Sequence, residues 1–486
     1  MVVNSDFLLV GKSNMLIRLC LFGLAVLGLS CDSLLGAGFP RGPLRVHGKN
    51  ARYFSHASGK AIILSGSHTW ANFQERGVEG HTPEFDYEAY LDFMEAHEHN
   101  FMRLWRWEHA QWMQFVPQDT LIRYKPMAYM RTGPGEALDG KPRFDLTQFN
   151  QAYFDRLRER VVSARQRGIY VGVMLFQGFS IEQKGTQGVD PKKGNPWDGH
   201  PFNRRNNVNG IDGDLNGNGE GEETHMLWNP PVLKFQDAYV RKVVDTLNNL
   251  DNVLYEVSNE SHGDSTQWQY HMIELVQAYE KGKPWQHPVG MSFQWGRNKG
   301  TNRNLFESPA DWVCPNGDEF LNNPPANNGG KIVIVDNDHI KPLESDPIWV
   351  WRNFFRGNHF ILMDCYKDFR IESPEHVDRK HDPARRAMGH AIKLAAQVNL
   401  MAMQPRNELA STQYCLANVG QEYLVYQPEE DADGVSVNLK AGQYAVRWID
   451  PLDLTVVKQE AVDAKDGFQE FTRPSKRSAI LHLNRR

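Results

Sequence analysis

The sequence of 486 residues has only five cysteines, and two of them lie in an apolar N-terminal segment. The other three, Cys314, Cys365 and Cys415, are widely spaced, so the sequence predicts neither a disulfide framework nor a zinc site. The 54 Lys and Arg residues are balanced by 59 Asp and Glu residues, and no long basic run occurs. This composition argues against a nucleic-acid partner. No glycine-rich phosphate loop follows the first predicted strand, which argues against a nucleotide site.

Long hydrophobic runs are also scarce, and the main one lies near the N-terminus. Met15–Ser30 combine one arginine, an apolar run and small residues, which is typical of a secretory signal and short for a transmembrane helix. We therefore expect residues 1–37 to be a signal peptide and the protein to be secreted or periplasmic. The mature chain should have no transmembrane segment. An uncleaved N-terminal anchor and a lipoprotein anchored through Cys31 are the alternatives.

Short apolar strands alternate with helical patterns after residue 40. Such alternation predicts a parallel sheet covered on both faces, and eight units in about 360 residues fit a (β/α)8 TIM barrel better than an open sheet. We expect the barrel over residues 40–404. The expected strands are Ala61–Ser65, Phe101–Trp105, Tyr170–Phe176, Val253–Val257, Val289–Phe293, Trp312–Val313, Ile332–Val335 and Phe360–Met363.

The pattern changes near residue 405. Short β-rich runs separated by turn-rich pieces predict a small all-β sandwich over residues 405–486. Its sequence has no convergent set of carboxylates or histidines, so we expect an accessory domain that carries no chemistry.

Polar and aromatic residues follow the strands, and in a barrel the carboxyl ends of all strands converge on one mouth. Flat aromatic rings at such positions can stack on sugar rings. The residues expected at the mouth are His68, Trp70, Arg103, Trp105, Gln177, Asn259, Glu260, Trp295, Asp336, Asp338 and His339.

Two carboxylates among these residues fit glycoside hydrolysis, which needs a proton donor and an ionised partner on opposite sides of one bond. Glu260 suits the acid/base role, and Asn259 is placed to bond a sugar hydroxyl. The second carboxylate is Asp336 or Asp338, and Asp336 is favoured because it leaves the strand first. Arg103 would lie beside it and keep it ionised by opposite charge.

These residues resemble the large clan of glycoside hydrolases with Asn-Glu at the end of barrel strand four. Within that clan, Ala61–Trp70 and Gly442–Asp450 are similar to segments of apiosidase-like hydrolases that carry a C-terminal collagen-binding-type β-domain. The resemblance implies an exported glycoside hydrolase that cleaves O-glycosidic bonds of a plant or algal oligo- or polysaccharide with retention of configuration. Most of that clan has Glu after strand seven, whereas this chain has Asp336 and Asp338. The shorter side chain leaves inversion open.

Two other functions compete with hydrolysis. A non-catalytic carbohydrate-binding or cell-surface protein could keep the barrel for recognition only. A metal-dependent barrel hydrolase could use His68, His262 and His339, but the sequence has no paired-histidine spacing of the H-x-H type. We therefore expect catalysis to require no cofactor.

One motif predicts a structural metal. The segment from Asp212 to Glu223 matches D-x-[DN]-x-[DN]-G-x5-E, the pattern of a Ca²⁺ loop. The eighth loop position is Gly219 instead of an aliphatic residue, and a flexible acidic surface loop is the alternative. The predicted ligands are Asp212, Asp214, Asn216, Asn218 and Glu223.

Overall fold

The computed structural model describes residues 42–78, 80–112, 121–184, 194–316, 320, 323–337, 345–364, 366–367, 377–428 and 433–486. They belong to one compact unit, Gly38–Arg486. The predicted signal peptide, residues 1–37, lies outside the described residues. In the part of the chain that is described, no helix is both long and apolar enough to cross a bilayer.

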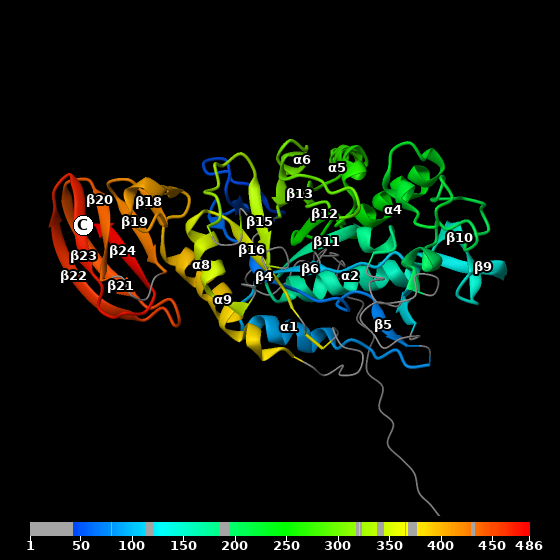
Figure 1. The fold of residues 1–486 in the computed structure, drawn as a ribbon, viewed down its shortest axis with the longest axis horizontal. Helices are drawn as coiled ribbons and strands as arrows, with labels where there is room; N and C mark the ends of the chain where they lie inside the picture. Colours follow the sequence, from blue (N-terminus) through cyan, green and yellow to red (C-terminus); the bar gives the residue numbers. More distant parts are fainter. Residues whose placement is uncertain are drawn as a thin grey trace, which may run out of the picture. The chain divides into compact units, whose positions relative to one another are not determined.

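Eight parallel strands close into a barrel, which confirms the predicted fold class (Figure 1). Strand one pairs with strand eight and with strand two, so the sheet has no free edge. In barrel order the strands are β4 (Ser65–His68), β6 (Phe101–Leu104), β11 (Tyr170–Gln177), β12 (Val253–Asn259), β13 (Val289–Ser292), β14 (Trp312–Cys314), β15 (Ile332–Asp336) and β16 (His359–Met363).

The barrel interior changes from apolar to charged along the strands. Phe101 of β6 and Leu254 of β12 belong to an apolar cluster that fills the amino-terminal end of the barrel. Because side chains alternate between the two faces of a strand, Arg103 and Glu256, two residues further on, also point inward. The interior is therefore apolar at its floor and charged toward its mouth.

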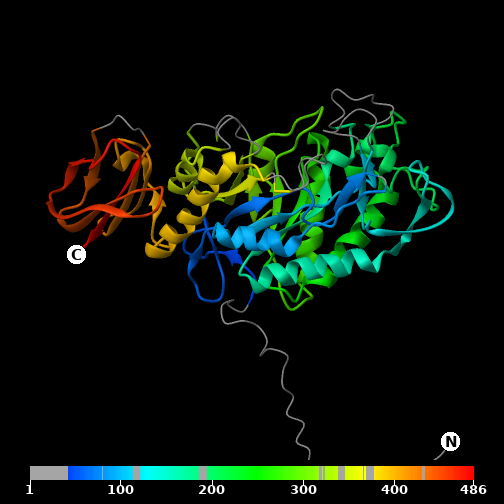
Figure 2. The same ribbon diagram turned by 90° about the horizontal axis from the view of Figure 1, so that it is seen from below.

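Helices cover the outside of the barrel through one apolar face each. In α2, Tyr153, Phe154, Leu157, Val161 and Ala164 are buried at helical spacing while the rest of the helix is largely polar. Helices α1 and α2 run side by side along the barrel (Figure 2). The described helices are α1 (Tyr87–Ala96), α2 (Gln151–Gln166), α4 (Pro230–Leu247), α5 (Thr266–Glu280), α6 (Asn302–Phe306), α8 (Ile348–Phe355) and α9 (Asp382–Gln397).

The predicted first strand, Ala61–Ser65, was wrong in its bounds. Ala61–Ile62 form β3 of a small antiparallel sheet with β1 (Arg45–Val46) and β2 (Phe54–Ser55), and the barrel strand begins only at Ser65. The barrel strand reads Ser-Gly-Ser-His and carries no apolar signal. Its Gly66 is required by packing, because a Cβ there would lie 1.6 Å from the carbonyl oxygen of Phe101.

Sequence reasoning did not predict the strands that lie outside the barrel between its first strand and α2. They are rich in charge, glycine and proline and largely exposed in β9 and β10, so they lack an apolar pattern. These strands form two small antiparallel sheets: β5 (Glu75–Val78), β7 (Gln111–Trp112) and β8 (Ile122–Lys125), and β9 (Tyr129–Glu136) with β10 (Pro142–Phe149).

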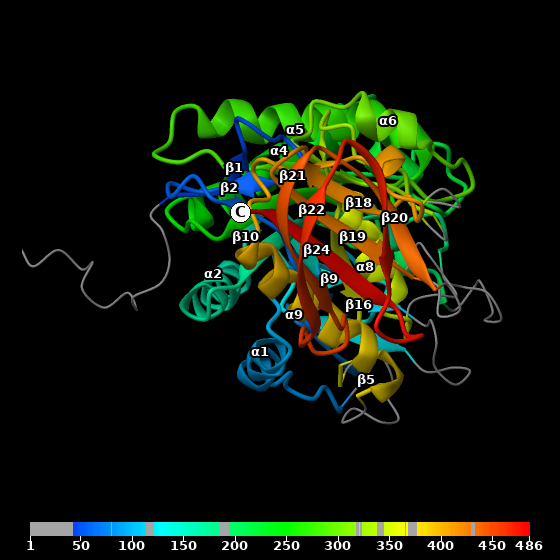
Figure 3. The same cartoon turned by 90° about the vertical axis from the view of Figure 1, so that its left-hand side faces the viewer.

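The C-terminal part consists of two antiparallel sheets that share one core, drawn in orange and red and facing the viewer in Figure 3. Val435 and Val437 of the small sheet pack with Tyr444, Val446 and Trp448 of the large one. The small sheet has β20 (Gly434–Leu439) and β23 (Gly467–Thr472). The large sheet has β17 (Gln404–Pro405), β18 (Cys415–Asn418), β19 (Glu422–Gln427), β24 (Ala479–Arg485), β21 (Gly442–Ile449) and β22 (Val456–Ala464).

Residues of this β-domain also join the main core. Tyr426 of β19 stacks on Phe355 of α8 with ring centroids 5.6 Å apart, and Leu416, Leu424 and Ile480 lie in the same apolar cluster as the barrel helices. The predicted boundary at residues 404–405 falls on β17, and it stays a prediction.

Candidate active site at the barrel mouth

Arg103 is the centre of a buried ion-pair network inside the barrel. Its Nε and Nη2 donate to the two carboxylate oxygens of Glu256 at 2.7 and 2.5 Å. Its Nη1 donates to Asp336 Oδ2 at 2.6 Å, and Nη2 also reaches Asn259 Oδ1 at 3.1 Å. The guanidinium therefore links barrel strands two, four and seven through a two-pronged contact that only arginine can make.

The charges of this network compensate one another. Arg103, Glu256 and Asp336 are at most 3% exposed. Burial disfavours the charged guanidinium, but Glu256 and Asp336 outweigh that penalty and raise the pKa of Arg103. Ser292 of β13 donates a further bond to Glu256. Removing one partner of such a group leaves an uncompensated buried charge.

Neighbouring groups hold Arg103 and Asp336 in place. His68 at the end of β4 has its Nε2 3.3 Å from Asp336 Oδ2, and its ring stacks on Trp105 with centroids 4.8 Å apart. Asn72 braces the end of β6, because its amide donates to the Arg103 carbonyl and its oxygen accepts from the Trp105 N–H. The positions of Arg103 and Asp336 are therefore fixed by packing as well as by charge.

The end of barrel strand four turns Glu260 away from the strand path. Asn259 donates to Gln177 Oε1 at 3.0 Å, and Glu260 follows with a φ of 48°, in the left-handed region that non-glycine residues rarely adopt. Gly178 lies against the Glu260 backbone so closely that a Cβ would be 2.2 Å from its carbonyl oxygen. Such strain clusters at functional sites. Glu260 is half-buried, in contrast to the buried Glu256.

Lys184 bridges the ends of strands four and five. Its Nζ donates to the carbonyl oxygens of Glu260 and Trp295 and lies 3.0 Å from Glu182 Oε2. Burial lowers the pKa of Lys184, and Glu182 and Glu260 oppose that shift. Lys184 therefore ties together the chain segments that follow strands four and five.

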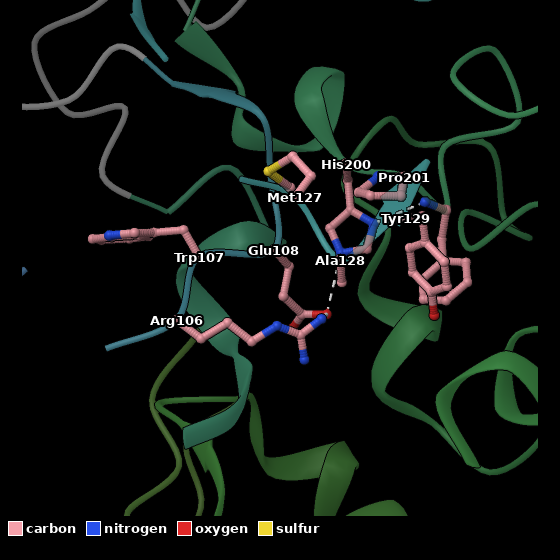
Figure 4. A pocket seen from close by; sticks show the side chains of 9 residues that line it. Arg106, Trp107, Glu108, Met127, Ala128, Tyr129, His200 and Pro201 are labelled. Atoms are coloured by element: carbon pink, nitrogen blue, oxygen red, sulfur yellow. Dashed lines mark hydrogen bonds and ion pairs between the residues drawn. The ribbon is translucent and has the colours of Figure 1, made fainter. Parts of the chain in front are cut away.

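A second buried network lies behind the mouth, around Glu108 (Figure 4). Glu108 Oε1 accepts from the Gln177 N–H at 2.7 Å and lies 3.1 Å from His225 Nε2, while Oε2 lies 3.6 Å from both Arg106 and His200. Although burial alone would raise it, Arg106 and the two histidines hold the pKa of Glu108 well below its usual value.

His225 connects this network to the end of strand four. Burial lowers the pKa of His225, so its ring is neutral near pH 7. A ring that donates from Nε2 to Glu108 must accept at Nδ1, and Ser261 Oγ lies 3.0 Å from Nδ1. The adjacent cavity, lined in part by Glu108 and His200, has a volume of about 10 Å³. A cavity of that volume holds about one water molecule and is too small for a substrate. We therefore interpret this network as a structural support.

The structure brings most of the predicted mouth residues together. His68, Arg103, Trp105, Gln177, Asn259 and Asp336 form one connected, buried group. Trp70 and Trp295 are half-buried, and the ammonium group of Lys299 lies 3.6 Å from the ring centroid of Trp295. Asp338 and His339 lie outside the described residues.

Sequence reasoning missed the role of Glu256. The sequence pattern places this residue only within the strand that leads to Asn259-Glu260, yet it is the principal partner of Arg103. The alternation of side chains could have found it, because Leu254 is a floor residue and Glu256 lies two positions further along the same face.

The predicted Ca²⁺ residues lie in an ordered loop with little regular structure after β11. Asp214 accepts the N–H groups of Gly217 and Gly219 at 3.1 and 2.9 Å. Within the described residues, no three His, Cys, Asp or Glu side chains are gathered as ligands of one metal ion. The C-terminal end of this loop contacts a residue near Glu260, because His262 Nε2 lies 3.0 Å from the Glu222 carbonyl oxygen.

Comparisons with known proteins point to the fold. One protein family, described as "Domain of unknown function (DUF6298)", matches residues 99–296, which include Arg103, Glu256 and Asn259-Glu260. No curated protein matches the sequence. A solved structure titled "Glycoside hydrolase" aligns with 91% of this chain and 97% of its own at 14% identity and a TM-score of 0.58. A glycoside hydrolase of family 5 from Bacteroides vulgatus covers 91% of this chain and 94% of its own, at 14% identity and a TM-score of 0.57.

Proposed function

We propose that the protein is an exported glycoside hydrolase that cleaves O-glycosidic bonds of an oligo- or polysaccharide from plants or algae. The observation that carries this proposal is the Arg103–Asp336 pair on barrel strands two and seven, in contact with Asn259 directly before Glu260. The titles of the solved structures with a similar fold support the same class of reaction.

Glu260 and Asp336 would divide the reaction between them. Protonated Glu260 gives its proton to the glycosidic oxygen as the bond from that oxygen to the anomeric carbon breaks. Ionised Asp336 attacks the anomeric carbon and forms a glycosyl-enzyme ester. Glu260, now a carboxylate, takes a proton from water, which attacks the same carbon and releases Asp336. Arg103 keeps Asp336 ionised before the attack and when it leaves.

Retention is the preferred outcome, and the distance between the two carboxyl groups decides between retention and inversion. Retaining enzymes keep their carboxyl groups about 5–5.5 Å apart, whereas inverting ones leave about 6.5–9.5 Å for a water. Aspartate is one methylene shorter than glutamate, so inversion with Asp336 or Asp338 as the base is the alternative mechanism. The half-buried rings of Trp70 and Trp295 are the proposed stacking surfaces for sugar units.

Non-catalytic carbohydrate binding is the second candidate function. It is favoured by one observation: Asp336 contacts both Arg103 and His68, so its charge is already satisfied without a substrate. In this case the mouth would bind sugars and leave the glycosidic bond intact.

A screen of aryl glycosides and plant polysaccharides separates the two functions. The wild type is compared with Glu260→Gln and with Glu159→Gln, the same change at an exposed position of α2. We expect an active wild type, an unchanged control, and a loss of about 10²- to 10⁴-fold for Glu260→Gln. Binding of an oligosaccharide with no turnover by the wild type would favour the binding protein.

A further inference from the structure

A large pocket lies among the small strands that follow barrel strand two. It has a volume of about 870 Å³ and is lined mainly by residues of β8, β9 and the turns beside these strands. Sites for small ligands commonly measure about 300–1,000 Å³. This β8–β9 pocket therefore has room for a ligand, in contrast to the small cavity beside Glu108.

The lining of the β8–β9 pocket is mostly cationic, although the whole chain has a net charge of −5. Arg123 and Lys125 lie two positions apart on β8, so their side chains leave the same face of the strand. A hollow lined by charges of one sign attracts ligands of the opposite sign. The charged residues among the described lining are Arg123, Lys125, Arg131, Lys141 and the acid Asp139.

Two arginines of the lining share one carboxylate. Arg131 donates from Nη1 to Asp139 Oδ1 at 3.1 Å and from Nη2 to Oδ2, while Arg123 Nη1 lies 3.9 Å from Oδ2. Burial lowers the pKa of Arg131 and the charge of Arg123 lowers it further, whereas Asp139 raises it. Arg123 also donates to Gln111, and Arg131 donates to the Pro142 carbonyl at 2.9 Å. Both guanidinium groups are therefore held in fixed positions, with only one negative charge between them.

The same lining also offers apolar surface. Met130 of β9 is 39% exposed, and Pro126 and Met127 line the pocket between the two strands. The rings of Tyr124 and Tyr129 belong to the lining as well. A charged sugar has an anionic substituent and apolar ring faces, so it can use both kinds of surface.

Aromatic contacts connect the pocket with the barrel mouth. Tyr124 of the lining packs on Trp107 with ring centroids 5.2 Å apart. Trp107 also contacts Trp70 and Trp105 of the mouth, each at 5.9 Å between centroids. In addition, β7, β8 and β9 all follow the carboxyl end of barrel strand two, which faces the mouth. A chain of sugars seated at the mouth could therefore extend into the β8–β9 pocket.

We propose that the β8–β9 pocket binds an acidic unit of the polysaccharide, a sugar that carries a carboxylate or a sulfate group. Both groups present several oxygens and a negative charge to arginine, whose planar fork binds such groups through paired hydrogen bonds. The inference rests on the proposed function and narrows the substrate to an anionic polysaccharide.

Calorimetric titration of the full chain tests this inference. The ligands are an oligogalacturonate, a sulfated carrageenan oligosaccharide and a neutral cello-oligosaccharide of similar length. Every protein carries Glu260→Gln, so that cleavage contributes no heat. At least one acidic ligand should bind about tenfold or more tightly than the neutral one, and about 500 mM NaCl should weaken this binding at least about fivefold relative to 50 mM. The tighter acidic ligand shows whether the pocket prefers carboxylate or sulfate.

Substitutions in the lining place the binding in this pocket. Lys125→Gln should weaken the acidic ligand about threefold, and the double variant Arg123→Gln/Lys125→Gln at least about tenfold, with no change for the neutral ligand. Lys281→Gln is the matched control, because Lys281 is exposed at the end of α5, away from the lining. It should bind all three ligands as the parent does.

Three outcomes would overturn the proposal. They are the absence of binding of both acidic ligands, equal affinity for acidic and neutral ligands, and unchanged affinity in the folded Lys125→Gln variant and the folded double variant. Lys125 is exposed, so its single variant keeps the test decisive if the double variant does not fold. Because binding is measured without turnover, a failure here differs from a failure of the proposed hydrolysis, which the screen of aryl glycosides measures.

Discussion

The barrel mouth and the C-terminal β-domain bury very different side chains with the same strand alternation. In the barrel, the inward face ends in Arg103, Glu256 and Asp336, which are held by mutual ion pairs. In the β-domain, the shared face of the two sheets carries apolar residues such as Val437, Val446 and Trp448. Buried charge costs free energy unless it is paired, so a fold that only needed stability could use the second solution. The mouth therefore holds buried charges that stability alone does not require.

Replacing Arg103, the cation of the barrel mouth, is the strongest test of the difference between the mouth and the β-domain. Arg103→Met should lower the free energy of unfolding by about 3–5 kcal/mol, because Glu256 and Asp336 lose their shared partner and remain buried. Denaturant unfolding of the purified variant measures this loss. Arg103→Lys keeps the charge but loses the two-pronged contact, so it should lie between the wild type and Arg103→Met. A loss below about 1 kcal/mol for Arg103→Met would mean that the mouth is not a coupled network.

A core substitution in the β-domain should lower the free energy of unfolding by a similar amount, but it should leave the activity unchanged. Trp448 is fully buried, and Trp448→Ala should cost about 3–5 kcal/mol through lost burial and a cavity. The folded variant should keep the wild-type kcat/KM, measured well below its Tm. A lower kcat/KM in fully folded protein would show that the β-domain contributes to the site.

Acid should weaken the barrel through its buried histidines. Burial lowers the pKa of His359 on β16 to about 4, from an ordinary value of 6.5. Between these two values the unfolded chain binds a proton that the folded chain does not, so stability falls as the pH drops from 6.5 to 4. The expected loss from this residue is about 3 kcal/mol. The free energy of unfolding measured across this range should fall less steeply in His359→Asn, and an unchanged slope would contradict the assignment.

A smaller effect is expected for Glu256→Gln. The amide keeps the shape of the side chain, and Asp336 still compensates Arg103, so the loss should be about 1–3 kcal/mol. Glu260→Gln, one residue beyond the same strand, should change stability by less than about 0.5 kcal/mol because its side chain is only half-buried. Denaturant unfolding of the two variants measures the difference, and equal losses would remove the distinction between a supporting and a reacting carboxylate.

The sequence predicted the barrel well where strands carried an apolar signal. The expected strands Tyr170–Phe176 and Val253–Val257 begin at the same residues as β11 and β12, and Arg103 and Asp336 were placed together because the ends of barrel strands converge. The first barrel strand could not be predicted, because Ser-Gly-Ser-His has no apolar pattern and its Gly66 packs against the carbonyl oxygen of Phe101. Side-chain alternation along β12 could have placed Glu256 on the inward face, but its pairing with Arg103, 153 residues away in the sequence, is not contained in a local pattern.

The central claim is that Glu260 and Asp336 act as acid/base and nucleophile, and rescue by azide tests it most directly. Glu260→Ala and Asp336→Gly are assayed on an activated aryl glycoside that the wild type cleaves, with and without azide, and the anomeric configuration of the glycosyl azide is determined by NMR. We predict that azide restores turnover in both variants, with retained configuration for Glu260→Ala and inverted configuration for Asp336→Gly, because azide replaces water in the first and the carboxylate in the second. Folded variants with wild-type rates, or the opposite pair of configurations, would contradict these roles.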